Sequence, residues 1–161
     1  MHETSGAPDL AAQLDAAEES CARQGGTLTA LRRSVLALIL DAGRPLTAYQ
    51  LLDRLREERP GAAPPTIYRA LDFLLEHRLI HRISRLNAFI PCQEADGAHG
   101  GHAHRVQFLI CRHCGSVTEI EDAAVLAALA AAARRQGFAP GEAVIELEGV
   151  CAACRAAEAT P

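Results

Sequence analysis

Apolar residues recur every three to four positions through the first half of the chain, a spacing that predicts helices packed on a shared core. Local signals mark where the helices begin: Thr47 and Gln50 form a capping box, and Pro64 suits a first helical turn. We expect four helices, bounded by Asp9 and Gly25, Thr29 and Gly43, Thr47 and Pro60, and Pro64 and Glu76.

The fourth predicted helix has two chemically different faces. One face is apolar and is expected in the core, at Ile67, Leu71, Leu74 and Leu75. The opposite face is polar, with Thr66, Arg69, Asp72 and Glu76. Two β-prone runs follow at residues 80–84 and 88–92 and predict a hairpin. Three helices, a fourth that presents polar groups and a β-ribbon follow the order of a winged helix-turn-helix.

A second unit is expected after a Gly- and His-rich stretch at residues 93–104, which has the composition of a linker. Strands are predicted at residues 106–111, 117–120 and 143–149, with an Ala-rich helix from Asp122 to Gln136. The fold class is therefore α+β. We expect a winged-helix domain at 1–92, a His-rich linker at 93–105 and a small α+β domain with a thin core at 106–161.

Composition adds a charge asymmetry that the net charge of −4 conceals. Residues 22–91 carry eleven arginines against six acids, whereas residues 1–21 carry five acids and no arginine. All sixteen basic side chains are arginine, which can contact both phosphates and guanine edges. The alternative is an ordinary solvated surface in an arginine-rich composition, and charge alone does not separate the two.

The beginning of the chain does not resemble a secretory signal, because residues 1–20 are acidic and have no apolar centre. No run approaches the roughly 20 apolar residues that a bilayer span needs. We therefore expect a cytoplasmic protein without a membrane partner. In that reducing compartment the six cysteines are better interpreted as metal ligands or structural thiols than as disulfides.

Two Cys-x-x-Cys pairs give the strongest chemical signal. Cys111 and Cys114 are followed, after thirty-six residues, by Cys151 and Cys154. Each pair places two thiolates on one side of a turn, and together they complete a tetrahedral four-sulfur site for structural zinc. Such a site contributes on the order of 10 kcal/mol, which a domain with a thin core needs. Redox dithiols or coincidental buried thiols are alternatives, but redox motifs do not usually occur as a matched pair.

A second candidate metal site lies at the base of the predicted wing. If the hairpin turns about Leu86-Asn87, His81 lies directly across from Cys92 and Ile83 across from Ile90. Directly opposed residues are close enough to share a metal ion.

Further ligands for this second site lie in the linker and the strand after it, at His99, His102, His104 and Glu119. A mixed set of nitrogen, sulfur and oxygen donors can close a tetrahedral zinc site at the junction of the two domains. Taken singly, His81 could be a hydrogen-bonded histidine, Cys92 a small core residue and Glu119 a solvated acid. Their convergence on one junction favours the metal site.

With these motifs the chain resembles the ferric uptake regulator family over nearly its whole length, and most closely its zinc uptake regulators. The segments that carry the resemblance are Leu28-Thr29 with Arg32, Thr47–Asp53, Pro64–Glu76, Phe108–Gly115 and Gly149–Cys154.

The resemblance implies which residues act. The paired cysteines would hold structural zinc in a C-terminal dimerisation domain, and a regulatory zinc would be bound by residues matching His81, Cys92, His104 and Glu119. That gives two zinc ions per chain. Because the linker is longer than we expect for the family, His102 could replace His104, and His99 with His102 could bind additional metal. The residues implied at DNA are Tyr49, Thr66, Tyr68 and Arg69.

The function implied is a dimeric, zinc-responsive repressor that binds palindromic operator DNA and controls zinc uptake genes. It would be neither an enzyme nor a binder of a small-molecule substrate. An iron- or peroxide-sensing regulator of the same family is the first alternative, and Cys92 argues against it because a thiolate ligand favours zinc. A zinc hydrolase using Glu119 as general base, or a zinc store that lacks DNA binding, are alternatives from other classes.

Overall fold

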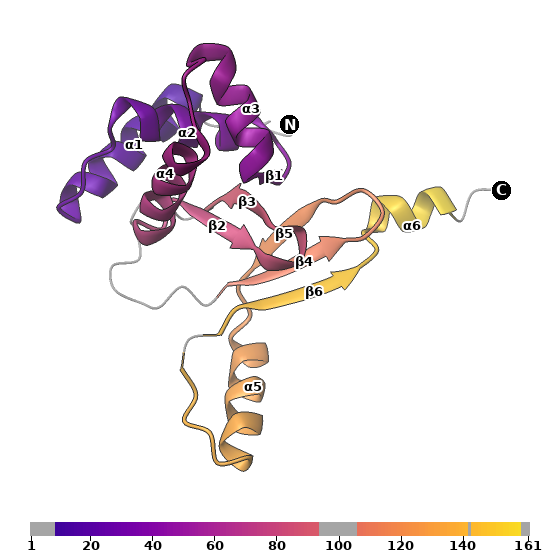
Figure 1. The fold of residues 1–161 in the computed structure, drawn as a ribbon. Helices are drawn as coiled ribbons and strands as arrows, with labels where there is room; N and C mark the ends of the chain where they lie inside the picture. The colour runs from indigo at the N-terminus through magenta and orange to yellow at the C-terminus, as the bar shows by residue number, and fades with distance from the viewer. Residues whose placement is uncertain (1–8, 94–105, 142, 159–161) are drawn as a thin grey trace, which may run out of the picture. The chain divides into compact units, whose positions relative to one another are not determined.

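A computed structural model describes residues 9–93, 106–141 and 143–158 (Figure 1). The chain divides into two compact units, residues 1–98 and 99–161. Most of the expected linker, including His99, His102 and His104, lies outside the described residues. In the described part of the chain, no helix is long and apolar enough to cross a membrane.

The first unit contains the four predicted helices and the wing (Figure 1). Its elements are α1 (Leu10–Arg23), α2 (Ala30–Asp41), β1 (Leu46–Thr47), α3 (Ala48–Glu58), α4 (Pro64–Glu76), β2 (Ile80–Ile83) and β3 (Ala88–Pro91). The sequence did not predict β1, because a strand of two residues has no measurable periodicity; it pairs with β3 to make a three-stranded sheet. The capping box at Thr47 and Gln50 is present as expected.

The core of the first unit gathers apolar side chains from all four helices. On α4, Ile67, Leu71 and Leu74 are fully buried, as predicted. Leu75 is only partly buried, and Phe73 takes a place in the core that the sequence analysis did not assign to it. Tyr68 and Arg69 remain exposed on the other face of α4. The core therefore holds α4 by one side and leaves its polar side open.

The hairpin of the wing is present, but the register predicted for it is wrong. His81 lies opposite Ile90, and Ile83 lies opposite Ala88. The reason is the turn, where a short 3-10 helix at Ser84–Leu86 is followed by Asn87 in the left-handed region, at φ 46°. This turn is centred one residue earlier than Leu86-Asn87, so the pairing shifts by two positions.

A shift of two positions leaves the same side chains on the same face of the sheet. Cys92 therefore becomes the diagonal neighbour of His81 instead of its direct partner. The pairing extends one step past β3, because the Cys92 backbone N–H donates to the Leu79 carbonyl at 3.0 Å. The corrected register still brings the two candidate ligands to one face at the base of the wing.

The last turn of α4 ends in a Schellman motif with an unusual residue at its left-handed position. The Leu79 N–H donates to the Leu74 carbonyl at 2.9 Å and the Arg78 N–H to the Leu75 carbonyl at 3.0 Å. Arg78 has φ 55°, a conformation that glycine adopts without the steric cost of a Cβ.

We expect Arg78→Gly to stabilise the first unit by about 1 kcal/mol. The steric cost of a side chain in the left-handed conformation exceeds the conformational entropy that glycine adds to the unfolded chain. Chemical denaturation of the two proteins would measure this difference. Gly43→Ala is the matched opposite change, since Gly43 has φ 61° and open space around it, and it should destabilise by a similar amount. A destabilised Arg78→Gly variant would contradict the steric account.

The second unit is built on a three-stranded sheet with the order β5-β4-β6. Its elements are β4 (Gln107–Cys111), β5 (Val117–Ile120), α5 (Ala123–Arg135), β6 (Ile145–Gly149) and α6 (Ala152–Glu158). β4 pairs antiparallel with β5 and parallel with β6, so α5 lies in the crossover between β5 and β6. α6 was not predicted, and the last strand begins two residues later than expected.

Two polar residues join the sheet of this unit to α5. The Asp122 side chain accepts from the backbone N–H groups of Ala124 and Val125, at 2.8 and 3.2 Å, and so caps the helix. The buried Gln107 accepts from the Asp122 backbone N–H at 2.8 Å. α5 itself has no fully buried side chain. The core of the unit is thin, as the sequence indicated.

Candidate functional sites

The two Cys-x-x-Cys pairs meet at one end of the sheet in the second unit. Cys111 ends β4, and Cys114 follows in a turn where Gly115 has φ 71°. Cys151 and Cys154 lie after β6, at the start of α6. The parallel pairing of β4 with β6, with Cys111 beside Gly149, brings the two turns together.

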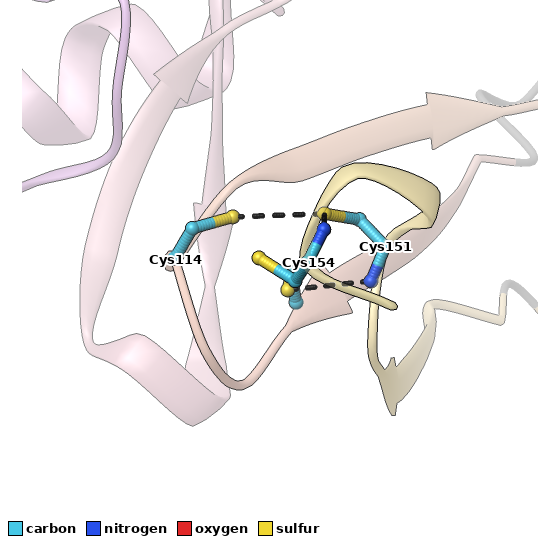
Figure 2. Close-up of side chains that lie close together, drawn as sticks. Cys114, Cys151 and Cys154 are labelled. Carbon is cyan, nitrogen blue, oxygen red and sulfur yellow. Dashed lines mark hydrogen bonds between the residues drawn. The ribbon is translucent and has the colours of Figure 1, made fainter. Parts of the chain in front are cut away.

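The distances between the sulfur atoms fit a tetrahedral metal site. The four Sγ atoms all lie within 4.8 Å of one another, and those of Cys114 and Cys151 are 3.8 Å apart (Figure 2). Zinc–sulfur bonds of about 2.3 Å in a tetrahedron place sulfurs about 3.8 Å apart. A disulfide would need about 2.05 Å. The donor set and its spacing fit one ion with four thiolate ligands.

Backbone and side-chain hydrogen bonds prepare part of this cluster for a cation. The Cys114 backbone N–H, followed by that of Cys151 at 3.3 Å from Sγ, lowers the pKa of Cys111 to about 5. The Ser116 hydroxyl, 3.1 Å from Cys114 Sγ, lowers the pKa of Cys114.

The fourth thiol of this cluster behaves in the opposite way. Its neighbours, first Cys151 and then Cys114, raise the pKa of Cys154 to about 12. Crowded sulfurs keep a proton when no cation compensates their charge. A divalent cation would displace that proton, so the cluster is arranged for metal binding and not for four free thiols.

The second group of candidate ligands is found in part within the first unit. The ligating atoms of His81 and Cys92 lie within 4.8 Å of each other, and Cys92 is buried. Glu119 is on β5 of the second unit, opposite Phe108. His102 and His104 lie outside the described residues. The base of the wing thus offers one nitrogen and one sulfur donor side by side.

The residues expected at DNA lie on the first turn of α3 and on the first two turns of α4. Tyr49 is 72% exposed and Tyr68 is 54% exposed, although large aromatic side chains usually find a partner surface. Arg69 is exposed beside Tyr68, and Thr66 is half-buried. Tyr49, Tyr68 and Arg69 therefore contribute little to the core and are accessible at the surface of the unit.

The second unit exposes apolar side chains that the sequence analysis did not single out. Phe138 is 72% exposed, and the other exposed apolar side chains of the unit, here called its apolar surface, are Leu109, Val125, Leu129, Val144 and Leu147. Alternation along β6, where Leu147 lies between Glu146 and Glu148, was the available sequence signal. Leu109 and Leu147 are paired neighbours on β4 and β6, so part of this exposure is shared by adjacent strands.

A model of the ferric uptake regulator family matches residues 23–148. The chain belongs to this family. It is 41% identical over 148 residues to the zinc uptake regulation protein of Escherichia coli (strain K12), which covers 89% of this chain and 81% of the relative.

Among solved structures, a zinc uptake regulator complexed with zinc and DNA is 38% identical, with a TM-score of 0.85, covering 95% of this chain and 99% of that one. Holo XcZur is 43% identical, with a TM-score of 0.79, covering 90% of this chain and 98% of that one. Both similarities cover at least 90% of this chain, so they include the unit with the four cysteines and the unit with α4.

Proposed function

We propose that this member of the ferric uptake regulator family is a cytoplasmic, zinc-responsive repressor that binds operator DNA as a homodimer and controls zinc uptake genes. The observation that carries the proposal is the pairing of a four-thiol cluster with a separate His–Cys pair at the base of the wing. The zinc and DNA bound by a similar solved protein support it.

The four-thiol cluster is assigned to structural zinc. Its ligands are Cys111, Cys114, Cys151 and Cys154, which leave no open position for water or substrate. This closed donor set, in a unit with a thin core, favours a role in folding and argues against hydrolysis at this site.

The regulatory zinc is assigned to His81 and Cys92, completed by Glu119 and His104, with His102 as the alternative to His104. A thiolate in the set favours zinc over iron or manganese, so the iron-sensing alternative is less well supported. We infer that zinc binds one arrangement of the chain more tightly than the other, and that this arrangement also binds DNA more tightly. Zinc then raises DNA affinity by at most the difference between its own affinities for the two arrangements. Reciprocity then requires DNA to tighten zinc binding equally.

The apolar surface of the second unit is assigned to the homodimer. Phe138, Val144 and Leu147 are each more than half exposed, so a second copy could cover them without displacing any other contact in the unit. A dimer with two-fold symmetry would bind two half-sites in a palindromic operator.

The polar side of α4 is assigned to the major groove. Arg69 would read a base edge, with Tyr68, Thr66 and Tyr49 around it, while other arginines of residues 22–91 neutralise phosphates. Exposure of both tyrosines supports this assignment.

Arg69→Ala should cost about 1–3 kcal/mol of specific DNA binding and leave zinc content and dimerisation unchanged, because Arg69 takes no part in the core or the metal ligands. Binding would be measured on a duplex selected from random DNA by the unaltered protein with zinc. Arg134→Ala, an exposed change at the end of α5 in the second unit, is the matched control and should keep full affinity. Equal losses of Arg69→Ala on selected and unselected DNA would show that Arg69 contacts only phosphate.

A further inference from the structure

Three side chains from α2 and α4 form a stack in the first unit. The guanidinium carbon of Arg32, in the first turn of α2, lies 3.6 Å from the centre of the Phe73 ring on α4. The His77 ring stacks on Phe73 with 3.9 Å between centres and 26° between planes. His77 Nδ1 lies 3.0 Å from the Phe73 carbonyl, which fixes the imidazole at the last turn of α4.

The loop between α1 and α2 contacts the stack at both ends. A Cβ built on Gly26 would clash with His77 Nε2, so the imidazole edge must move if any residue other than glycine stands there. Thr27, the next residue, accepts a hydrogen bond from Arg32 through its carbonyl at 2.7 Å. The Gly26 backbone N–H in turn donates to the Cys21 carbonyl of α1 at 2.8 Å.

These contacts close a ring of interactions. It runs from Gly26-Thr27 through Arg32 and Phe73 to His77 and back to Gly26. Helix α4 is also held by its buried apolar face. Apolar attraction is non-directional, whereas hydrogen bonds and stacked planes are directional, so this ring adds an orientational restraint on the end of α4.

We propose that His77 is a positioning residue that, seated against Gly26, fixes the placement of α4 and thereby the specificity of DNA binding. This inference rests on the proposed function, in which Tyr68 and Arg69 of the same helix contact DNA. His77 directly follows α4, about two turns beyond Tyr68 and Arg69, and acts through the helix. Sequence-independent DNA binding depends on positive charge, and breaking the contacts between Gly26 and His77 leaves every arginine in place.

The test uses the full-length zinc-loaded protein and a double-mutant cycle of Gly26→Ala and His77→Ala. Gly61→Ala is the matched control, because a Cβ at Gly61 meets nothing within 4 Å. Affinity is measured on a duplex selected by the unaltered protein and on unselected DNA, well below the melting temperature. Hydrogen exchange at the backbone amides of residues 74–79 is measured without DNA.

Gly26→Ala should weaken binding to the selected duplex about two- to tenfold, the range expected for losing one stacked pair. The affinity for unselected DNA should stay unchanged. The substitution should also speed exchange at the last turn of α4. In the His77→Ala background the same change should have no further effect, because the small side chain leaves room for the added Cβ.

The positioning role would be overturned by any of three results. The two substitutions could have additive effects on affinity, Gly26→Ala could bind DNA as Gly61→Ala does, or affinity could fall equally on selected and unselected DNA. If the unaltered protein selects no duplex, the proposed function fails. The exchange measurements then still decide whether Gly26 and His77 are coupled, so the two failures are distinguishable.

Discussion

Replacing Cys151 with Ser is expected to release the structural zinc and unfold the second unit. A hydroxyl is a poor substitute for a thiolate at a four-sulfur site, and Cys151 begins the second turn with its Sγ 3.8 Å from that of Cys114. The unit has a thin core, with no fully buried side chain on α5. Losing metal binding on the order of 10 kcal/mol should exceed what the remaining contacts supply.

Metal content, melting behaviour and mass in solution would be measured together for Cys151→Ser. The dimer should be lost with the zinc, because the apolar surface belongs to the same unit. Cys21→Ala removes a buried thiol of the first unit and is the matched control; it should keep both zinc and dimer. A Cys151→Ser protein that stays dimeric with unchanged melting would contradict a structural role for the cluster.

Replacing Cys92 with Ser should separate sensing from folding. Cys92 follows β3 in the first unit and belongs to a different group of ligands from the paired cysteines. Its loss removes the only sulfur proposed for the regulatory site, so zinc should bind there far more weakly. About one tightly held zinc per chain should remain at the four-sulfur site, whereas zinc-dependent DNA binding should be lost.

The wing should survive this substitution, since serine is close in size to cysteine and the backbone hydrogen bond to Leu79 is kept. Circular dichroism and zinc content by mass spectrometry would verify the fold and the remaining metal. Cys21→Ala again is the matched control and should respond to zinc as the parent does. Operator binding by Cys92→Ser at the same free zinc as the parent would remove Cys92 from the sensing ligands.

Helices α1 to α5 could be predicted because their determinants are local. The caps at Thr47 and Asp122 and the prolines that open α4 lie within a few residues of the boundaries they set. The wing register could not be predicted in the same way. It depends on Asn87 taking the left-handed position after a 3-10 turn, which the spacing of β-prone residues does not reveal.

The sites were predictable to different degrees. The spacing of a Cys-x-x-Cys pair places both thiols on one side of a turn, so the four-thiol cluster could be predicted from the sequence alone. The grouping of His81 with Cys92 was expected from a wrong register and held because a shift of two preserves the face. The stack of Arg32, Phe73 and His77 joins positions far apart in the sequence, and no local pattern marks it.

The central claim is that zinc binding at a site separate from the four-sulfur cluster controls specific DNA binding. Its most direct test is a titration of the purified protein with buffered free zinc, following fluorescence anisotropy of a labelled duplex selected by the same protein. The account predicts weak binding with the structural zinc alone and a steep rise in affinity as a further zinc binds each chain. DNA affinity that stays constant while that further zinc binds would contradict it.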